Sequence, residues 1–429
     1  MTIQDLYNIY LQHPVICTDT RKITQGCLFF ALKGDTFDGN GFAQMALEKG
    51  ASFAIIDNAQ YQQNDRYLLF DDTLDTLQQL AKHHRQQLTI PVIGITGTNG
   101  KTTTKELMRS VLSKKFSTYA TEGNLNNHIG VPLTLLSIPP ATEIAIIEMG
   151  ANHQKEISFL SSLAQPAIGL ITNVGKAHLE GFGGFEGVKK AKGELYEYLR
   201  DTGGTIFIDE GNPFLMEMSK ALNLKKIVYY GKESSGTKGN IIESDPFLSI
   251  EWEAAGKQGT INTQLTGTYN LSNILAAIAI ASHMGLTAEE INTGISSYQP
   301  GNNRSQIKHT ESNILICDYY NANPSSMAAA IENFGSISAD NKIMILGDMF
   351  ELGDESAAEH AAILKKAGSV NAARIFIGKE FSKLRDNSGE FFETTSGAYD
   401  AIAKKPHKNA TILIKGSRGM KLEQLTDIL

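Results

Sequence analysis

With 429 residues, the chain is long enough for nearly three domains of about 150 residues each. Hydrophobic residues make up 41% of the chain and charged residues 20%, which is typical of globular proteins and excludes a disordered or collagen-like chain. The 46 acidic and 39 basic residues give a net charge of -7, which argues against a protein whose main task is to coat nucleic acid or an anionic membrane.

Cysteine content and hydropathy exclude further classes of protein. Cys17, Cys27 and Cys317 are too few and too scattered for a disulfide framework or a zinc cage. Residues 1–20 contain no basic cluster and no long apolar core, so we expect no signal peptide. The longest apolar run, residues 274–281, is far shorter than the ~18 residues that a membrane span requires. We therefore expect a cytoplasmic protein with neither a membrane nor a nucleic acid as its partner.

Residues 1–85 form a first block of short elements. Apolar runs and turn signals predict, in chain order, a strand at 15–16, a strand at 27–32, a helix at 42–49 and a strand at 52–56. Apolar residues then recur at three- and four-residue spacing, so residues 73–87 are expected to form a helix that leads into the next domain.

Residues 86–300 alternate between strands and helices. The expected elements are a strand at 92–96, a helix at 102–112, a strand at 144–149, a helix at 156–163, and strands at 167–172, 205–208 and 226–230. Such alternation predicts a parallel sheet covered by helices on both faces. Residues 248–265 contain glycine turns and alternate in polarity, which predicts an antiparallel ribbon, and residues 270–284 are expected to form a helix.

Residues 301–429 show the same alternation again. Strands are expected at 313–317, 343–346, 374–377 and 411–414, with helices between them and at the end of the chain. This pattern predicts a second doubly wound sheet. The whole chain is therefore expected to be an α/β protein with three domains, at residues 1–85, 86–300 and 301–429.

The segment GITGTNGKTT at residues 94–103 follows a buried strand and opens a helix, which is the setting of a phosphate-binding loop. Its glycines let backbone N–H groups close on phosphate oxygens, and the amino end of the helix adds a positive dipole. Lys101 supplies charge for the β- and γ-phosphates, and the Thr102 hydroxyl is placed to bind Mg²⁺. Ile95 stands where the strict motif has its first glycine, but the flanking elements disfavour the alternative of a glycine turn with a surface lysine.

Two further polar residues lie at the ends of neighbouring predicted strands. Glu148 ends one strand, and Asn173 follows the next. The carboxyl ends of parallel strands share one edge, where ligands bind, so Lys101, Glu148 and the loop from Asn173 should converge. An acid beside a nucleotide phosphate is a natural Mg²⁺ ligand, although Glu148 alone could equally be a polar residue at a strand end.

Residues 97–103, GTNGKTT, resemble the nucleotide loop of the Mur ligases, the ATP-dependent amide-forming enzymes of peptidoglycan precursor synthesis. The segments 121–132, 318–324 and 415–419 resemble the family member that joins D-alanyl-D-alanine to UDP-MurNAc-tripeptide. The resemblance implies a small N-terminal α/β domain for the UDP substrate, a central P-loop ATPase-like domain and a C-terminal Rossmann-like domain. It also implies that ATP is used and that two Mg²⁺ ions are bound.

The resemblance assigns residues to the ATP site. It implies that Asn270 contacts adenine, Asp318 takes the ribose hydroxyls, and Arg304 reaches the γ-phosphate when the domains close. Cys317 stands where relatives often carry another acid. Without the resemblance, Arg304 would more often form a surface salt bridge. The phosphate loop completes the expected nucleotide site with Gly97, Thr98, Asn99, Gly100, Lys101, Thr102 and Thr103.

Residues 173–180 are similar to the metal segment of the family. By resemblance, Thr102 holds one Mg²⁺, and Glu148, His178 and a carbamylated Lys192 hold the second. Taken alone, Lys192 would belong to a basic helix face, and His178 would more often be a loop or core histidine. The residues expected to take part in catalysis are Lys101, Glu148, His178, Lys192 and Arg304.

Other segments resemble the substrate-binding parts of the family. The UDP part of the substrate is expected at Thr20, Arg21, Lys33 and Gly34. The family more usually has a histidine where Asn40 or Gly41 stands. Further substrate contacts are expected at Asn124, Asn126, Asn127, Asn321 and Asn323. The last two would lie near the incoming dipeptide, or would instead form a turn before a helix that starts at Pro324.

Three alternatives compete with this function. The preceding ligase, which adds the third amino acid, carries an Asp-Asn-Pro-Arg signature that this sequence lacks. A folate-type polyglutamate ligase is disfavoured by the UDP-like first domain, and a nucleotide-binding protein without catalysis is disfavoured by the complete set of expected catalytic residues. We expect a monomer that acts on UDP-MurNAc-tripeptide and D-Ala-D-Ala. The sequence does not decide between lysine and diaminopimelate in the tripeptide, and it assigns no role to His360.

Overall fold

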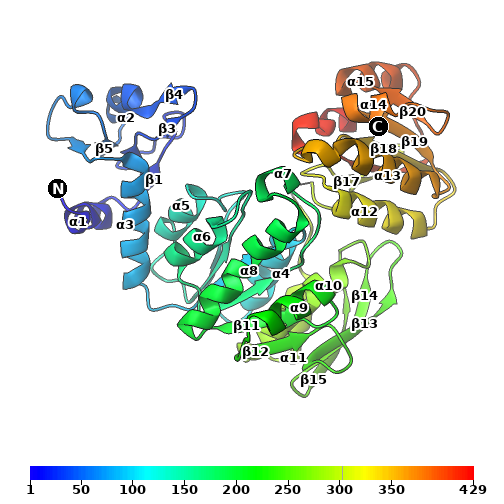
Figure 1. Ribbon diagram of the computed structural model, residues 1–429, viewed down its shortest axis with the longest axis horizontal. Helices are drawn as coiled ribbons and strands as arrows, with labels where there is room; N and C mark the ends of the chain where they lie inside the picture. The colour runs from blue at the N-terminus through cyan, green and yellow to red at the C-terminus, as the bar shows by residue number, and fades with distance from the viewer. Residues whose placement is uncertain (302) are drawn as a thin grey trace.

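The computed structural model describes residues 1–301 and 303–429 and contains three main β-sheets in three successive parts of the chain. In Figure 1 the N-terminal part (blue) and the C-terminal part (yellow to red) stand apart on either side of the central part. The expected three-domain α/β architecture is confirmed. The exact residue bounds of the three domains stay a prediction.

The N-terminal domain has a parallel four-stranded sheet in the order β1-β2-β5-β6. Its strands are β1 (Ile16–Cys17), β2 (Leu28–Phe30), β5 (Phe53–Ile56) and β6 (Tyr67–Leu69), with a hairpin of β3 (Lys33–Gly34) and β4 (Phe37–Asp38). Its helices are α1 (Ile3–Gln12), α2 (Ala43–Glu48) and α3 (Thr73–Gln87), with 3₁₀ turns η1 (Gly39–Phe42) and η2 (Ala59–Tyr61). The buried Arg85 fastens α3 to the central domain, because it donates to the carbonyls of Ala164 and Gln165 at 2.8 and 3.1 Å.

The central sheet has nine strands in the order β15-β14-β13-β12-β11-β10-β7-β9-β8. They are β7 (Val92–Thr96), β8 (Thr118–Ala120), β9 (Ile144–Glu148), β10 (Ile168–Ile171), β11 (Thr205–Asp209), β12 (Ile227–Tyr230), β13 (Thr237–Glu243), β14 (Ser249–Ala254) and β15 (Lys257–Asn262). Neighbouring strands from β8 across to β13 are parallel, whereas β14 and β15 form the antiparallel ribbon expected from the sequence.

Helices cover both faces of this sheet, as the alternation of elements predicts. They are α4 (Lys101–Leu112), α5 (Gly130–Leu136), α6 (Glu156–Ala164), α7 (Leu179–Phe182), α8 (Phe185–Thr202), α9 (Pro213–Ala221), α10 (Asn270–His283) and α11 (Ala288–Ser296). Successive residues of β7 point to opposite faces: Val92 packs in the core with α5, α6 and α8, whereas Ile93 packs with α4, α10 and α11. Every residue of β7, β9 and β10 is buried, so the strand ends that carry the site are rigidly held.

The C-terminal domain has a six-stranded sheet in the order β16-β17-β21-β18-β19-β20, in which only β16 is antiparallel. Its strands are β16 (Gln306–His309), β17 (Asn313–Asp318), β18 (Lys342–Gly347), β19 (Ala373–Ile377), β20 (Glu390–Phe392) and β21 (Ala410–Lys415). Its helices are α12 (Pro324–Ser336), α13 (Ser356–Gly368), α14 (Lys379–Lys383) and α15 (Thr395–Lys404), with 3₁₀ turns η3 (Gly353–Glu355), η4 (Arg418–Met420) and η5 (Leu422–Asp427).

The strands that the sequence analysis did not predict are mostly edge strands. Four of them, β6, β8, β16 and β20, lie at the ends of their sheets, and β13 has a mostly polar sequence. Short edge strands bury fewer side chains, so their hydropathy signal is weak. Among the described residues, no helix combines the length and the apolar character that crossing a membrane would need.

Candidate active site

A cavity of about 890 Å³ opens at the carboxyl ends of β10, β7 and β9, which are adjacent in the central sheet. The convergence expected for Lys101, Glu148 and Asn173 is present, because all three line this cavity. Its walls come from the central domain and from the C-terminal domain. The other expected site residues that line it are Gly97, Thr98, Asn99, Gly100, Thr102, Thr103, Asn124, Asn126, Asn127, His178, Lys192, Asn270, Arg304, Asp318, Asn321 and Asn323.

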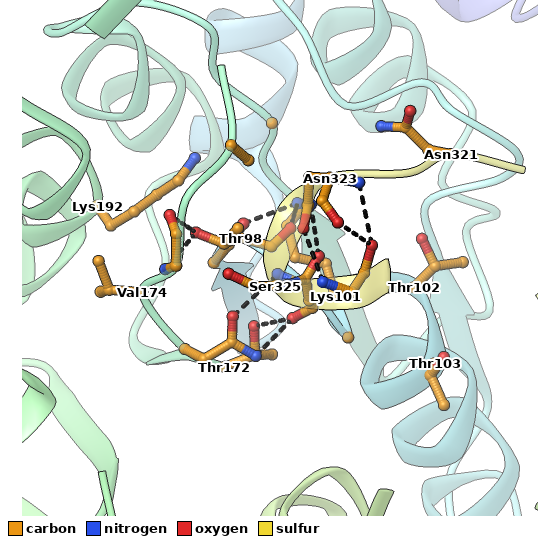
Figure 2. A pocket seen from close by; sticks show the side chains of 18 of the residues that line it. Thr98, Lys101, Thr102, Thr103, Thr172, Val174, Lys192, Asn321, Asn323 and Ser325 are labelled. Carbon is orange, nitrogen blue, oxygen red and sulfur yellow. Dashed lines mark hydrogen bonds between the residues drawn. The ribbon is translucent and has the colours of Figure 1, made fainter. Parts of the chain in front are cut away.

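Two glycines let the phosphate loop close against β10. Gly97 and Gly100 have φ angles of 141° and 78°, in the region that favours glycine. A Cβ atom at Gly97 would lie only 2.0 Å from Thr172 Oγ1. Thr172 Oγ1 donates to Asn99 O at 2.6 Å, and Asn99 N donates to Asn173 Oδ1 at 2.9 Å. The residues after β10 therefore hold the loop in shape (Figure 2).

Lys101 begins α4 and folds back over the loop. Its ammonium donates to the carbonyl oxygens of Gly97 and Thr98 at 2.7 and 3.1 Å. Desolvation lowers the pKa of Lys101, an effect that Glu148 opposes and Arg304 reinforces. Both partners are neutral carbonyl groups, so neither of them offsets the positive charge of the ammonium, and a bound phosphate could do so.

Glu148 is a carboxylate at the end of β9 with only 2% of its surface exposed. Thr102 Oγ1 donates to its Oε2 atom at 3.0 Å, and Asn126 Nδ2 donates to its Oε1 atom at 2.8 Å. These partners are neutral, and a buried carboxylate favours a cation close by. Because Mg²⁺ prefers carboxylate and hydroxyl oxygens, Glu148 and Thr102 fit one Mg²⁺ ion beside the phosphate loop.

His178 and Lys192 do not form a metal site in their unmodified state. His178 Nδ1 faces Oε2 of Glu351 from the C-terminal domain, and Lys192 packs with its ammonium 5.2 Å from the centre of the Phe182 ring. In the described part of the chain, no group of three or more His, Cys, Asp or Glu side chains could hold a metal ion. Burial, reinforced by Lys101, lowers the pKa of Lys192 to about 7. A second ion would fit here only with Lys192 converted to an anionic group.

The residues expected at adenine and ribose line the same cavity. Asn270 is buried; its Nδ2 atom donates to Thr266 O at 2.7 Å, and its Oδ1 atom accepts from Asn273 Nδ2 at 2.8 Å. Lys415 Nζ donates to Asp318 Oδ2 at 2.6 Å at the ends of β21 and β17. The sequence analysis did not single out Asn273 or Lys415, although Lys415 lies in the segment 415–419 that resembles the family.

Arg304 reaches the cavity from the C-terminal domain. Its guanidinium carbon lies 3.8 Å from the centre of the Tyr320 ring, a stacking contact that orients the arginine. Among the described residues, its Nε atom has no hydrogen-bond partner. Arg304 is therefore a cation held in place by an aromatic ring, with donors left for an anion.

The turn that the sequence left open as an alternative for Asn321 and Asn323 is present. Asn323 caps α12, because its Oδ1 atom accepts the Ser326 N–H at 2.9 Å. Asn321 Oδ1 accepts the N–H of Ala322 at 2.9 Å. Contact of either asparagine with a dipeptide stays a prediction.

The residues expected to hold the UDP moiety lie on the N-terminal domain and do not line this cavity: Thr20, Arg21, Lys33 and Gly34. Arg21 pairs with Asp19 at 2.7 Å, and Lys33 pairs with Asp57 at 2.7 Å. Asn40, only 1% exposed, donates to Asp57 Oδ1 at 2.7 Å. Asn40 thus ties η1 to the residue that follows β5.

A phosphate loop on a doubly wound sheet, faced by a Rossmann-like domain and preceded by a small α/β domain, defines a three-domain ATP-dependent ligase. The chain belongs to the Mur ligase family. Three family descriptions match it in turn: "Mur ligase family, catalytic domain" at residues 14–85, "Mur ligase middle domain" at 95–281, and "Mur ligase, glutamate ligase domain" at 303–418.

Individual relatives and solved structures agree over nearly the whole chain. The UDP-N-acetylmuramoyl-tripeptide–D-alanyl-D-alanine ligase of Bacillus subtilis is 37% identical over 96% of this chain and 92% of its own. The ligase of the same name from Escherichia coli is 34% identical over 96% and 93%. A crystal structure of MurF from Acinetobacter baumannii superposes with a TM-score of 0.87 at 32% identity, over 96% and 92%. MurF from Thermotoga maritima in complex with ADP gives 0.86 at 25% identity, over 96% of each chain.

Proposed function

We propose that this chain uses ATP to join D-Ala-D-Ala to UDP-MurNAc-tripeptide in cytoplasmic peptidoglycan precursor synthesis. Relatives that carry this activity in their name match 96% of the chain, and a similar structure from Thermotoga maritima is a complex with ADP. The observation that carries the proposal is the phosphate loop beside a buried acid, where Thr102 of the loop donates to Glu148 at 3.0 Å and Lys101 lines the same cavity.

The chemistry requires activation because a carboxylate is a poor electrophile. The terminal carboxylate of the tripeptide attacks the γ-phosphorus of ATP, which forms an acyl phosphate and releases ADP. The dipeptide amine then attacks the acyl carbon; it loses a proton, phosphate leaves, and the amide remains. Both steps depend mainly on positioning and on neutralising negative charge.

We assign the charge-neutralising roles to residues of the cavity. Lys101 and Arg304 contact the phosphates of ATP. Thr102 and Glu148 would hold one Mg²⁺, and Glu148, His178 and a carbamylated Lys192 would hold a second. When bound, such ions allow the like-charged carboxylate and phosphate to approach each other. Closure of the domains around the cavity would exclude water, which would otherwise hydrolyse the acyl phosphate.

We assign the binding of the two peptide substrates to several segments, and we propose that the enzyme acts as a monomer. The N-terminal domain would hold the UDP moiety, and the loop after β8 would hold the part of the substrate nearest the cavity. The residues assigned to the substrates are Thr20, Arg21, Lys33, Gly34, Asn124, Asn126, Asn127 and Asn321.

A phosphate-release assay tests this function. Purified protein is given ATP, Mg²⁺, UDP-MurNAc-tripeptide and a panel of amine acceptors, and we expect release that depends on D-Ala-D-Ala. The Lys101→Ala variant is the matched control, and we expect it to show no turnover because the phosphate loop loses its cation. Release driven by a single diamino acid, offered with the UDP-MurNAc-dipeptide as the acyl substrate and with D-Ala-D-Ala inert, would identify the preceding ligase. No phosphate release with any acceptor would indicate a nucleotide-binding protein without catalysis.

A further inference from the structure

A polar contact joins the C-terminal domain to the phosphate loop. Asn323, at the start of α12, donates from its Nδ2 atom to Asn99 Oδ1 at 2.8 Å, across a sequence separation of 224 residues. Asn99 lies in the loop between Gly97 and Lys101. Figure 2 shows Asn323 and Ser325 lying against this loop.

Both ends of the Asn323 amide are already used within the protein. Its Oδ1 atom accepts the Ser326 N–H at 2.9 Å and caps α12, while its Nδ2 atom contacts Asn99. Only 9% of the residue is exposed. A side chain that is buried and engaged at both ends is better suited to fixing the protein's own geometry than to binding a diffusible dipeptide.

The backbone of Asn99 is fixed from the other side. Its N–H donates to Asn173 Oδ1 at 2.9 Å, and its carbonyl accepts from Thr172 Oγ1 at 2.6 Å and from Asn173 Nδ2 at 3.0 Å. The Asn99 side chain is thus the group through which a second domain can act on this loop. The contact reaches the segment whose carbonyls at Gly97 and Thr98 hold the Lys101 ammonium.

A second hydrogen bond beside the first also joins the C-terminal domain to the central domain. Ser325 Oγ accepts the N–H of Lys176 at 3.1 Å. A Cβ atom at Gly175 would lie 2.8 Å from that hydroxyl, so a glycine there permits the close approach. The start of α12 therefore contacts both segments that shape the phosphate site: the phosphate loop and the residues after β10.

We propose that Asn323 is a positioning residue that couples the seating of the C-terminal domain to the geometry of the phosphate loop, through the side chain of Asn99. The inference rests on the proposed ATP-dependent function. It separates two roles that the sequence does not distinguish, because a positioning residue affects ATP use and a dipeptide ligand affects acceptor use. Arg304 is carried by the same domain, so seating that domain also brings this cation to the nucleotide.

The Asn323→Ser variant tests the coupling while it preserves the cap of α12, since serine is a good N-cap but is too short to reach Asn99. We expect KM for ATP and the Kd of ADP to rise about threefold to tenfold, with a lower kcat, as for the loss of one hydrogen bond. KM for D-Ala-D-Ala should stay unchanged. A higher KM for D-Ala-D-Ala with unchanged ATP parameters would assign Asn323 to the dipeptide and overturn the proposal, as would unchanged parameters throughout.

A double-mutant cycle isolates the pair. The double variant Asn99→Ala/Asn323→Ser should lose no more ADP affinity than the more strongly affected of the two single variants, because both substitutions remove the same contact. Additive losses in the double variant would contradict coupling through Asn99. Thr394→Ala is the matched control, since it removes the cap of another helix in the same domain, where Thr394 Oγ1 accepts the Gly397 N–H at 3.1 Å. ADP affinity is measured without an acceptor, so this test stands even if the acceptor panel shows a different ligase.

Discussion

Lys192 combines burial with a like charge close by. It is 3% exposed, and desolvation together with the charge of Lys101 lowers its pKa to about 7. Near neutral pH a large fraction of its amine is therefore uncharged, and the uncharged amine is the form that reacts with carbon dioxide to give a carbamate. A carbamate would place an anion where the unmodified side chain offers none to a cation.

We predict that Lys192→Ala strongly reduces turnover and that short carboxylic acids added to the assay restore part of it, because the acid can occupy the space of the carbamate. The rate is measured with and without acetate, and Lys190→Ala on the same helix serves as the control. A carbamate resonance from ¹³C-bicarbonate in the wild type, missing in the variant, would support the same role. Full activity of Lys192→Ala without added acid would contradict it.

His360, to which the sequence assigned no role, holds a loop in place. It is fully buried; its Nε2 atom accepts the N–H of Met349 at 3.0 Å, and its Nδ1 atom lies 2.7 Å from Ser356 O. These partners fix the orientation of the ring. The loop between them carries Glu351, which faces His178 across the domain boundary. The function of His360 is thus structural, and it acts at a distance from the cavity.

At the scale of elements, α3 joins the first two domains. Leu77, Leu80 and Ala81 are buried in the same core as residues of the central sheet, as their spacing predicts. His84 lies on the same helix, 8% exposed, and its Nδ1 atom lies 3.3 Å from the Tyr7 hydroxyl of α1. Burial, together with the charge of His83, lowers the pKa of His84 below its ordinary value.

This lowered pKa makes the stability of the α1–α3 contact depend on pH. As the pH falls through the ordinary histidine range, the unfolded chain binds a proton that the folded His84 resists, so the free energy of unfolding decreases. We predict a smaller decrease for His84→Phe, which keeps an aromatic ring beside Tyr10. Urea unfolding between about pH 7.5 and 5.5 measures the difference. If the free energies of unfolding of the wild type and His84→Phe change equally with pH over this range, His84 titrates normally and the prediction is wrong.

At the scale of the whole molecule, charged side chains also join the C-terminal domain to the segment after β10. Lys176 Nζ pairs with Glu359 Oε1 at 2.6 Å, and His178 faces Glu351. In Figure 1, α7, which follows this segment, lies on the side of the central domain that faces the C-terminal domain. The contacts place the C-terminal domain against the site in the conformation described here.

A charge swap tests how much the Lys176–Glu359 pair contributes to this seating. Lys176→Glu should weaken the docking of the C-terminal domain by about 1 kcal/mol, because ion pairs that are partly exposed contribute little, and the effect should shrink in high salt. The double variant Lys176→Glu/Glu359→Lys should restore the docking of the C-terminal domain against the central domain. Energy transfer between dyes on the N- and C-terminal domains reports the change. A double variant as poorly seated as the single one would indicate that the pair does not set the domain arrangement.

Local sequence signals predicted most of the fold. The structure places β7 at the predicted residues 92–96 and α3 at the predicted residues 73–87, because each has a clear apolar pattern that depends only on neighbouring residues. The edge strands β8 and β20 escaped prediction because they are short and pair on one side only. The rule that the carboxyl ends of parallel strands share one edge also predicted that Glu148 and Lys101 would line the same site.

The sequence by itself determined the phosphate loop, since its glycines, Lys101 and the flanking strand and helix are encoded within one short segment. Only the tertiary structure decided which distant groups complete it. Asn323 meets Asn99, and Glu351 meets His178, because the separately folded central and C-terminal domains come together around one cavity. Neither pairing leaves a local pattern, since hydrogen bonds between domains depend on where whole domains pack and not on the periodicity of any one element.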